Sequence, residues 1–480
     1  MNWKEQAIKY LNDSLYPVST ELNEIDWKSG LSPKSDRLAQ HICAFANQED
    51  GGFLVFGVNN DATMFSVTKE QTDEIVKTLG NIALNNLSHS VQIQHNTIEY
   101  NGNALLFVYI PEQTEKPVYL RGKTIHDSYH RSAGQTVKMS PYEVKQMIAQ
   151  SQGLLFHEQY AMTKVNADDV LRLLDYMCYF QLTGRNFPES KSVILEALAD
   201  GEFIEKQGDY WNITNLGALL FARDLTKFKG LQFKTLRIIL YTGKGRIDAH
   251  PEVNFKEGYA FGFEHFIQFI MERTSVEVIE RVFREVKETY PERTVRELLA
   301  NALIHQDLWQ TGTHTMVEIF PDRMEMTNPG TPLVDVNRFI DAPPKSRNDK
   351  IAILMHLFDF CELRGSGVDR AIEAVEKAIL PAPKFIRGDF YTKVVIYPKK
   401  TFAEMSKEDR IRACYQHCCL KYMSNEKMTN QSFRERMGIE EKNYPMASKI
   451  IKETVNAGLI KEYSPENKSR KFTSYIPHWG

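Results

Sequence analysis

Hydrophobic and polar residues follow two patterns along the chain, and each pattern predicts one kind of secondary-structure element. Apolar residues that recur every three or four positions are typical of amphipathic helices, whereas short continuous apolar runs are typical of buried strands. The helical rhythm predicts helices at residues 3–15, 36–47, 168–180, 191–201, 255–274, 293–305, 351–360, 368–378, 409–422, 429–438 and 445–457. Apolar runs predict strands at residues 53–58, 104–110, 203–204, 210–213, 236–241, 276–283, 315–320, 323–326 and 390–397. The mixture predicts an α+β multidomain protein.

The order of these elements divides the chain into four predicted domains. They cover residues 1–150, 155–235, 236–400 and 403–480, and a chain of 480 residues has the length for three or four domains of ordinary size. In the second and fourth domains, short helices precede a β-hairpin, which predicts a winged-helix connector and a C-terminal winged helix. For the connector, a purely structural spacer is the alternative.

Composition and charge narrow the class of protein. Hydrophobic residues make up 42% of the chain, charged residues 25%, and the net charge is −3, all ordinary for a water-soluble protein. No segment approaches the about 20 apolar residues that a membrane-spanning helix needs, and the N-terminal residues lack the apolar core of a signal peptide. Six cysteines without a Cys-x-x-Cys pair favour reduced thiols. We therefore expect a cytoplasmic protein with no membrane partner.

The predicted helix at 293–305 carries the most informative polar residues. Glu297, Asn301 and His305 are four residues apart, so a helix places them on one stripe. The amide oxygen of Asn301 can ligate Mg2+, which prefers oxygen ligands, and the carboxylate of Glu297 can take a proton from an attacking water. The alternative is a surface helix whose polar residues are unrelated.

Two later motifs add to this stripe. Asn328-Pro329-Gly330 follows the predicted strands at 315–320 and 323–326, and Gly365-Ser366-Gly367 opens the predicted helix at 368–378. A glycine-rich turn at a helix start exposes backbone N–H groups that suit a phosphate. Each motif is weak alone, and their order is the specific part. A third glycine segment, Gly243-Lys244-Gly245, lacks the spacing of a P-loop.

In this order the motifs resemble the GHKL ATPase superfamily, and most closely the RecG-related ATP-binding proteins. The resemblance implies a GHKL-like α/β sandwich with ATP and Mg2+ as cofactors, in which Asn301 holds Mg2+, Glu297 activates water and Asn328 contacts adenine. It places further residues at the nucleotide: Gly330, Arg347, Asn348, Gly365, Ser366 and Gly367. One departure is Gln306, where these relatives usually have arginine.

The first 150 residues carry a separate resemblance. Ala44-Phe45-Ala46-Asn47, Gly51-Gly52, Gly57-Val58-Asn59-Asn60 and the later Arg131-Ser132 resemble the Schlafen-type AlbA domain. Such a domain implies nucleic-acid binding, with Lys28 and Arg131 among the cations at phosphates.

A metal-dependent nuclease is the second function open to such a domain, because Glu21, Asp26 and Lys28 match the spacing of the Schlafen nuclease motif. Carboxylates in that arrangement could hold a divalent metal at a scissile phosphate. Asp26 and Asn59-Asn60 depart from the nuclease pattern, in which a glutamate and an aspartate pair occur. Ordinary exposed charges are the third interpretation.

The last 78 residues, 403–480, have a modest basic bias, with 14 lysines and arginines against 10 acidic residues. In a DNA-binding winged helix, Lys449 and Lys452 of the recognition helix and Arg470 and Lys471 of the wing would contact DNA. A winged helix that binds another protein is the alternative.

Together these features lead us to expect a cytoplasmic, homo-oligomeric, ATP-binding and ATP-hydrolysing protein that binds nucleic acid, DNA rather than RNA. It would act as a regulator or in antiviral defence against foreign DNA. The alternatives are an ATP-gated, metal-dependent nuclease and an oligomeric assembly protein that binds ATP without hydrolysing it.

Overall fold

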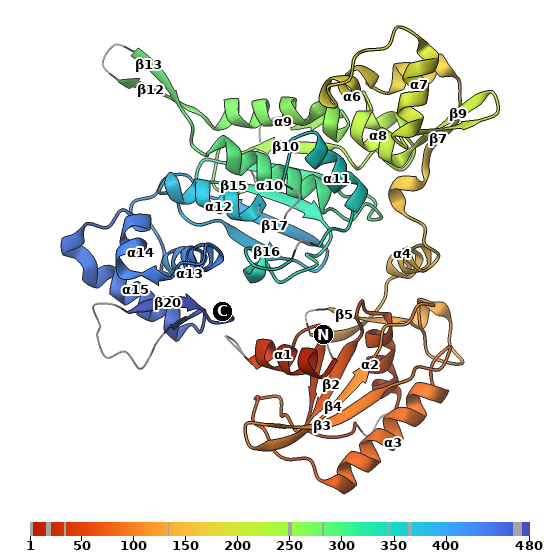
Figure 1. Ribbon diagram of the computed structural model, residues 1–480, viewed down its shortest axis with the longest axis vertical. Helices are drawn as coiled ribbons and strands as arrows, with labels where there is room; N and C mark the ends of the chain where they lie inside the picture. The colour runs from red at the N-terminus through yellow and green to blue at the C-terminus, as the bar shows by residue number, and fades with distance from the viewer. Residues whose placement is uncertain are drawn as a thin grey trace. The chain divides into compact units, whose positions relative to one another are not determined.

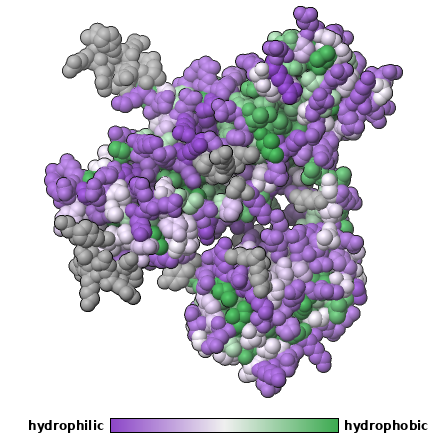
Figure 2. Space-filling view, viewed as in Figure 1, coloured by the Kyte–Doolittle hydropathy of each residue, from purple (hydrophilic) through white to green (hydrophobic). Residues whose placement is uncertain are grey.

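The computed structural model describes residues 3–15, 21–32, 35–132, 134–247, 252–280, 283–343, 345–362, 367–463 and 473–480. The chain forms two compact units, residues 1–155 and 156–480 (Figure 1). The surface face shown in Figure 2 is mostly hydrophilic, with hydrophobic side chains in scattered patches. Within the part of the chain that the structure describes, every helix is too short or too polar to cross a membrane.

Unit 1 is built on a four-stranded sheet in the order β1-β2-β4-β3. Its strands are β1 (Ile25–Lys28), β2 (Gly52–Phe56), β3 (Gln94–Tyr100) and β4 (Asn103–Ile110). β1 and β2 are parallel, and the other neighbours are antiparallel. The helices are α1 (Trp3–Leu15), α2 (Ser35–Asn47), α3 (Lys69–Asn85) and α4 (Pro141–Ser151), and β5 (Tyr129–Ser132) and β6 (Gln135–Lys138) form a hairpin.

Alternate residues of the central strands of unit 1 enter two different cores. Leu54 and Phe56 of β2 pack in the core that includes α2 and α3, whereas Phe53 and Val55 pack in the core that includes α1. This is the alternation expected of a strand with both faces covered. It confirms the buried strand predicted at 53–58 and the helices predicted at 3–15 and 36–47.

Unit 2 contains a six-stranded mixed sheet in the order β11-β10-β14-β15-β17-β16. Its strands are β10 (Leu236–Leu240), β11 (Val253–Phe255), β14 (Thr315–Phe320), β15 (Arg323–Pro329), β16 (Lys384–Arg387) and β17 (Tyr391–Ile396). Only β10 and β14 are parallel among the described pairs of this sheet. α9 (Tyr259–Thr274), α10 (Glu292–Ile304), α11 (Asp349–Leu357) and α12 (Gly367–Lys377) lie along this sheet (Figure 1).

Two smaller helix-and-sheet modules flank this centre within unit 2. The first has α5 (Ala167–Leu173), α6 (Tyr176–Leu182), α7 (Lys191–Asp200), α8 (Asn215–Phe221) and the strands β7 (Tyr160–Val165), β8 (Ile204–Gln207) and β9 (Tyr210–Thr214). The second has α13 (Lys407–Met423), α14 (Asn430–Met437), α15 (Tyr444–Asn456) and the strands β18 (Met428–Thr429), β19 (Ile460–Glu462) and β20 (Ser474–Pro477). Helices beside a three-stranded sheet agree with the winged helices predicted at 155–235 and 403–480, whose identification stays a prediction.

One hydrophobic core runs through most of unit 2. It joins residues of the first module, such as Leu219 and Phe221, to Phe263 of α9 and Leu299 of α10. The hydrophobic core is therefore continuous across the predicted boundary near residue 235. The division of the chain into four domains stays a prediction.

Three predicted elements differ in the structure. The helix predicted at 168–180 is two helices, because Leu174 bridges to Ala222 and the Asp175 carboxylate accepts a hydrogen bond from Cys178 N (2.9 Å) to start α6. The helix predicted at 255–274 begins only at Tyr259. The strand predicted at 276–283 is part of a hairpin of β12 (Val276–Glu280) and β13 (Phe283–Lys287), which projects from the rest of unit 2 (Figure 1).

Candidate functional sites

In the polar stripe of α10, Glu297 is buried and Asn301 is half-buried, and both lie near Gly367, the first residue of α12. Glu297 is only 7% exposed, and its Oε2 has no hydrogen-bond partner among the described residues. The Nδ2 of Asn301 is likewise buried without a partner. A Cβ atom on Gly367 would lie 2.7 Å from Glu297 Oε2 and 3.7 Å from Asn301 Nδ2. The structure thus brings Glu297, Asn301 and Gly367 together, as the motif order predicted, and contradicts the alternative of a surface helix.

Burial also tunes the acidity of this site. It raises the pKa of the Glu297 carboxyl, although the positive charges of Arg370, Arg293 and Arg296 act in the opposite direction. A carboxylate with a raised pKa is a better acceptor of a proton from water near neutral pH. On the other side of α10, Leu299 and Leu303 are fully buried, so packing fixes the direction in which Glu297 points.

Asn328 and Gly330 lie at the end of β15, which contacts α10. Alternation along the strand places Asn328 on the same face as Met324 and Met326, and those two methionines belong to the core that includes α10. Asn328 is 6% exposed, and its Nδ2 donates to the Pro329 carbonyl (3.2 Å). Gly330 has φ +101, and a Cβ atom there would lie 2.2 Å from Arg347 Nη1, so this position requires glycine.

Arg347 and Asn348 bind main-chain groups around the same site. Asn348 Nδ2 donates to the carbonyls of Ile304 (2.7 Å) and Gln306 (2.8 Å), which holds the C-terminal end of α10. Arg347 Nη2 donates to the Thr331 carbonyl (3.0 Å), whereas the buried Nη1 makes no hydrogen bond to a described residue and forms a long ion pair with Asp307 Oδ2 (3.9 Å). The amide of Asn348 thus has a structural role, and Arg347 Nη1 has only a long ion pair with Asp307 to exchange for a bound anion.

His305 and Gln306 complete the end of α10. Burial and the charge of Arg347 lower the pKa of His305 to about 4, so its ring is neutral at pH 7. Gln306 is fully buried and its Nε2 donates to Tyr259 Oη (2.9 Å). The departure at Gln306 therefore supports the packing of α9 on α10.

These residues fit a nucleotide with its magnesium ion. On α10 and on the loop before α11, three buried polar atoms have no hydrogen-bond partner among the described residues: Glu297 Oε2, Asn301 Nδ2 and Arg347 Nη1. Buried polar groups are normally satisfied, so such a group of exceptions is expected where a polar ligand binds. Asn301 also carries the amide oxygen that Mg2+ prefers. Gly365 and Ser366 lie outside the described residues, so their predicted cover of the phosphates stays a prediction.

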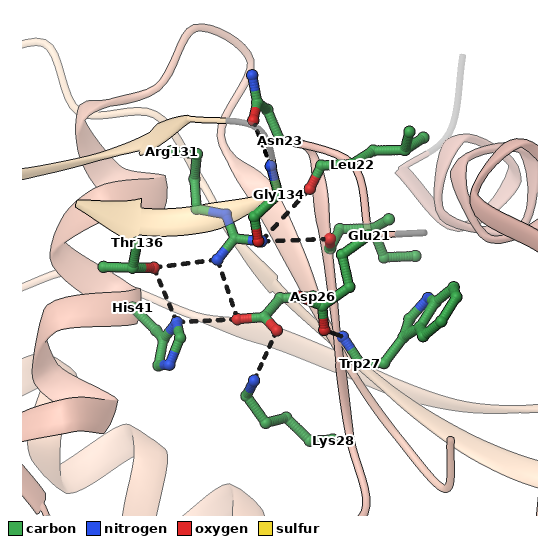
Figure 3. Close-up of polar contacts among 11 residues, drawn as sticks. Glu21, Leu22, Asn23, Asp26, Trp27, Lys28, His41, Arg131, Gly134 and Thr136 are labelled. Carbon is green, nitrogen blue, oxygen red and sulfur yellow. Dashed lines mark hydrogen bonds and ion pairs between the residues drawn. The ribbon is translucent and has the colours of Figure 1, made fainter. Parts of the chain in front are cut away.

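A second polar cluster lies inside unit 1, around Asp26 of β1 (Figure 3). Asp26 is 1% exposed. Its Oδ1 accepts from Lys28 Nζ (2.6 Å), and its Oδ2 lies 2.8 Å from His41 Nδ1 and 3.1 Å from Arg131 Nη1. Although burial raises it, the hydrogen bond from His41 and the charges of Arg131 and Lys28 hold the pKa of Asp26 well below its usual value. Asp26 is therefore an internal counterion.

Glu21 and Arg131 are also engaged inside this cluster. The Glu21 carboxylate accepts from Trp27 N (2.8 Å), and burial together with the neighbouring Asp26 raises the pKa of Glu21 to about 7. Arg131 is 6% exposed, and its Nη2 donates to the Gly134 carbonyl (2.5 Å). The prediction that Arg131 contacts phosphates disagrees with this burial.

The carboxyl groups of Glu21 and Asp26 lie within hydrogen-bond reach of each other, and their role as nuclease ligands stays a prediction. Both Asp26 oxygens face cations or the His41 ring. Within the described ranges, three histidine, cysteine or acidic residues are nowhere arranged to hold a metal ion. Sequence reasoning missed His41, although a histidine within the apolar run of α2 signals a buried polar partner.

The C-terminal module leaves part of its predicted DNA-binding surface accessible. Lys449 and Lys452 of α15 are exposed, as contacts with phosphates would require. Arg470 and Lys471 lie outside the described residues, so the wing contacts stay a prediction.

Comparisons with known proteins identify two parts of the chain. Residues 21–140 match the family model "Schlafen, AlbA_2", and residues 312–396 match "Putative ATP-dependent DNA helicase recG C-terminal". The second match covers Asn328, Gly330, Arg347 and Asn348 and begins after α10. No curated protein matches the sequence.

Two solved structures are similar over different lengths. The DIP2311 protein of Corynebacterium diphtheriae is 15% identical, with 99% of this chain and 98% of that chain covered and a TM-score of 0.41. The N-terminal domain of a "Putative ATP-dependent DNA Helicase RecG-related Protein" from Nitrosomonas europaea is 21% identical, with 28% and 92% covered and a TM-score of 0.20. The two family matches agree with both resemblances drawn from the motifs. Residues 21–140 are therefore a Schlafen AlbA_2 domain, and residues 312–396 are a domain of the RecG C-terminal family.

Proposed function

We propose that this chain is a cytoplasmic, ATP-hydrolysing, nucleic-acid-binding protein in which Glu297 is the general base and Asn301 holds Mg2+. The observation that carries the proposal is the buried Glu297 Oε2, which has no hydrogen-bond partner among the described residues and lies beside Asn301 and beneath Gly367. The two family matches support its coarse form, an ATP-binding protein related to nucleic acids. We assign it a regulatory or antiviral defence role on DNA, as a homo-oligomer.

Each residue of the site has a separate task in this proposal. ATP, bound through Mg2+, supplies a phosphoryl group that water can attack. Glu297 accepts a proton from that water, and its raised pKa suits it to this step. Asn301 ligates the cation through its amide oxygen. Arg347 binds phosphate oxygens with Nη1, which makes no hydrogen bond to a described residue and lies 3.9 Å from Asp307 Oδ2, and Asn328 contacts the adenine.

ATP turnover in Mg2+ tests the proposal. General-base catalysis contributes roughly 100- to 10,000-fold, so Glu297→Gln is expected to lower turnover by at least about 100-fold while ATP still binds. The matched control is Glu292→Gln, because Glu292 is an exposed residue of the same helix. Equal turnover in wild type and Glu297→Gln would contradict the assigned base.

The nucleic-acid-binding half of the proposal needs separate experiments. We expect turnover to change when DNA is added and to change less with RNA. If neither binds in gel-shift assays, with or without ATP, the nucleic-acid half of the proposal is wrong. Light scattering with and without ATP tests the homo-oligomer, and a monomer under both conditions would contradict it.

A further inference from the structure

A cleft of about 840 Å3 opens in unit 2 beside the buried site. Its walls come from the base of the β12–β13 hairpin, the start of α10, one side of α12 and the segment after β17. Five of its lining residues are cationic: Lys287, Arg293, Arg370, Lys377 and Lys399. Only two are acidic, so the lining carries a net charge of +3 in a chain whose own net charge is −3.

The two acids do not neutralise this charge. Glu373 pairs with Lys377 (2.7 Å), and the Glu288 carboxylate accepts from Glu292 N at the start of α10 (3.3 Å). Arg370 pairs with Glu362 outside the lining.

Lys287, Arg293 and Lys399 are exposed and have no ion pair among the described residues. Three unpaired cations around one cleft attract an anion with several charges, because the potential inside a concave surface adds up.

Apolar side chains share the cleft with these cations. Ala374 and Leu380, which belong to α12 and the turn after it, line it together with Pro398. A ligand that fits both halves carries several negative charges together with apolar groups. Unpaired bases on a phosphodiester backbone have this composition, whereas a duplex hides its base faces.

We propose that this cleft binds single-stranded nucleic acid through its phosphates. The proposal rests on the proposed function, to which it adds the form of the nucleic acid and its place in unit 2. Because Arg293 and Arg370 lie both in the cleft and near the Glu297 carboxylate, a strand bound here would change the charge around the site of ATP hydrolysis. This provides a direct physical route from nucleic acid to turnover.

The test compares two double variants of the full chain. Lys287→Gln/Lys399→Gln removes two unpaired cations from the cleft, and Lys227→Gln/Lys229→Gln removes two exposed lysines elsewhere in the same unit. The measured quantity is the affinity for a labelled single-stranded oligonucleotide at several salt concentrations. Each phosphate contact to a single strand contributes about 0.7 to the slope of log K against log salt. The cleft variant should therefore lose about 1.4 from that slope, and the control should keep it. Thermal unfolding confirms that both variants are folded.

Other outcomes separate this proposal from the proposed function. If wild type binds the strand and both variants keep its slope, the cleft proposal is wrong and the proposed function stands. If the cleft variant loses binding of inorganic tripolyphosphate but not of the strand, the ligand is a free polyphosphate and the strand proposal is wrong. A wild-type protein that binds no strand contradicts this proposal and the nucleic-acid half of the proposed function, while ATP turnover still tests the other half.

Discussion

Asp26→Asn distinguishes a structural from a catalytic role for the cluster in unit 1. The substitution keeps the size of the side chain but removes the charge that faces Lys28, His41 and Arg131. A metal ligand could be lost in this way without loss of stability. The loss of an internal counterion must lower the stability, because its charged partners would remain buried without compensation.

The expected loss of stability follows from the exposure of the partners. The side chains of Asp26 and Arg131 are each 1% exposed, at an N–O distance of 3.1 Å. Removing one member of a buried ion pair typically costs about 3–5 kcal/mol, because the other charge stays buried without compensation. Since whole domains are stable by only about 5–15 kcal/mol, unit 1 should lose a large share of its stability.

The pH dependence has a definite sign. The pKa of Asp26 is lowered in the folded protein, so its contribution to stability is fully present above the usual value of 3.8 and is lost as the pH falls below it. Wild type and Asp26→Asn should therefore differ most near neutral pH and converge in acid.

Hydrogen exchange followed by mass spectrometry measures this loss in unit 1 within the intact chain. The free energy of opening of the β1 and β2 amides is expected to fall by about 3–5 kcal/mol in Asp26→Asn. Asp127→Asn is the control, because Asp127 pairs with Lys138 (2.7 Å) with half of the lysine side chain exposed, and such pairs contribute about 0–1 kcal/mol. Unchanged exchange in Asp26→Asn, together with loss of a metal-dependent cleavage, would refute the structural role.

Three further substitutions test other parts of the structure. Gly330→Ala should lower the thermal unfolding midpoint and weaken ATP binding, because φ is +101 and the new Cβ would collide with Arg347. The strain of a positive φ alone costs about 1–3 kcal/mol. An unchanged unfolding midpoint would contradict the geometry. Asn348→Ala should destabilise unit 2 by about 2 kcal/mol or more in urea denaturation, since two buried carbonyls at the end of α10 lose their donor. Wild type should lose stability as the pH rises from about 4.5 to about 7, because the pKa of Glu21 is raised to about 7 in the folded protein. Glu21→Gln should remove this pH dependence, and identical pH profiles of the two proteins would contradict the raised pKa.

The sequence predicted elements well where a local pattern determines them. α2 follows the apolar positions Leu38, Ile42 and Phe45, and all three are buried. α14 ends at Gly438, whose φ of 62 is left-handed, as a glycine stop predicts. The predictions were wrong where a tertiary contact interrupts a pattern: the apolar rhythm continues across Asp175, but that side chain starts a new helix.

The two candidate sites differ in the same respect: one depends on a local pattern and the other on long-range contacts. The stripe of Glu297 and Asn301 is a local pattern on one helix, and the sequence predicted it. The environment of Asp26 is not local, because Arg131 is 105 residues away along the chain and spacing alone gives no reason to pair them. The same carboxylate that matched a nuclease motif is therefore a buried counterion, a distinction that only its partners reveal.

α12 joins the proposed ATP site to the C-terminal module. Its first residue, Gly367, lies over Glu297. Near its other end, Glu376 lies 3.0 Å from His417 Nδ1 on α13 and 3.1 Å from Arg436 Nε on α14, with both partners buried. An α-helix of 11 residues is a stiff rod about 16 Å long. A ligand that shifts the start of α12 must therefore move the C-terminal module with it or break a buried ion-pair network, which costs several kcal/mol. Because moving both together avoids that cost, we expect the C-terminal module to follow a shift at the start of α12.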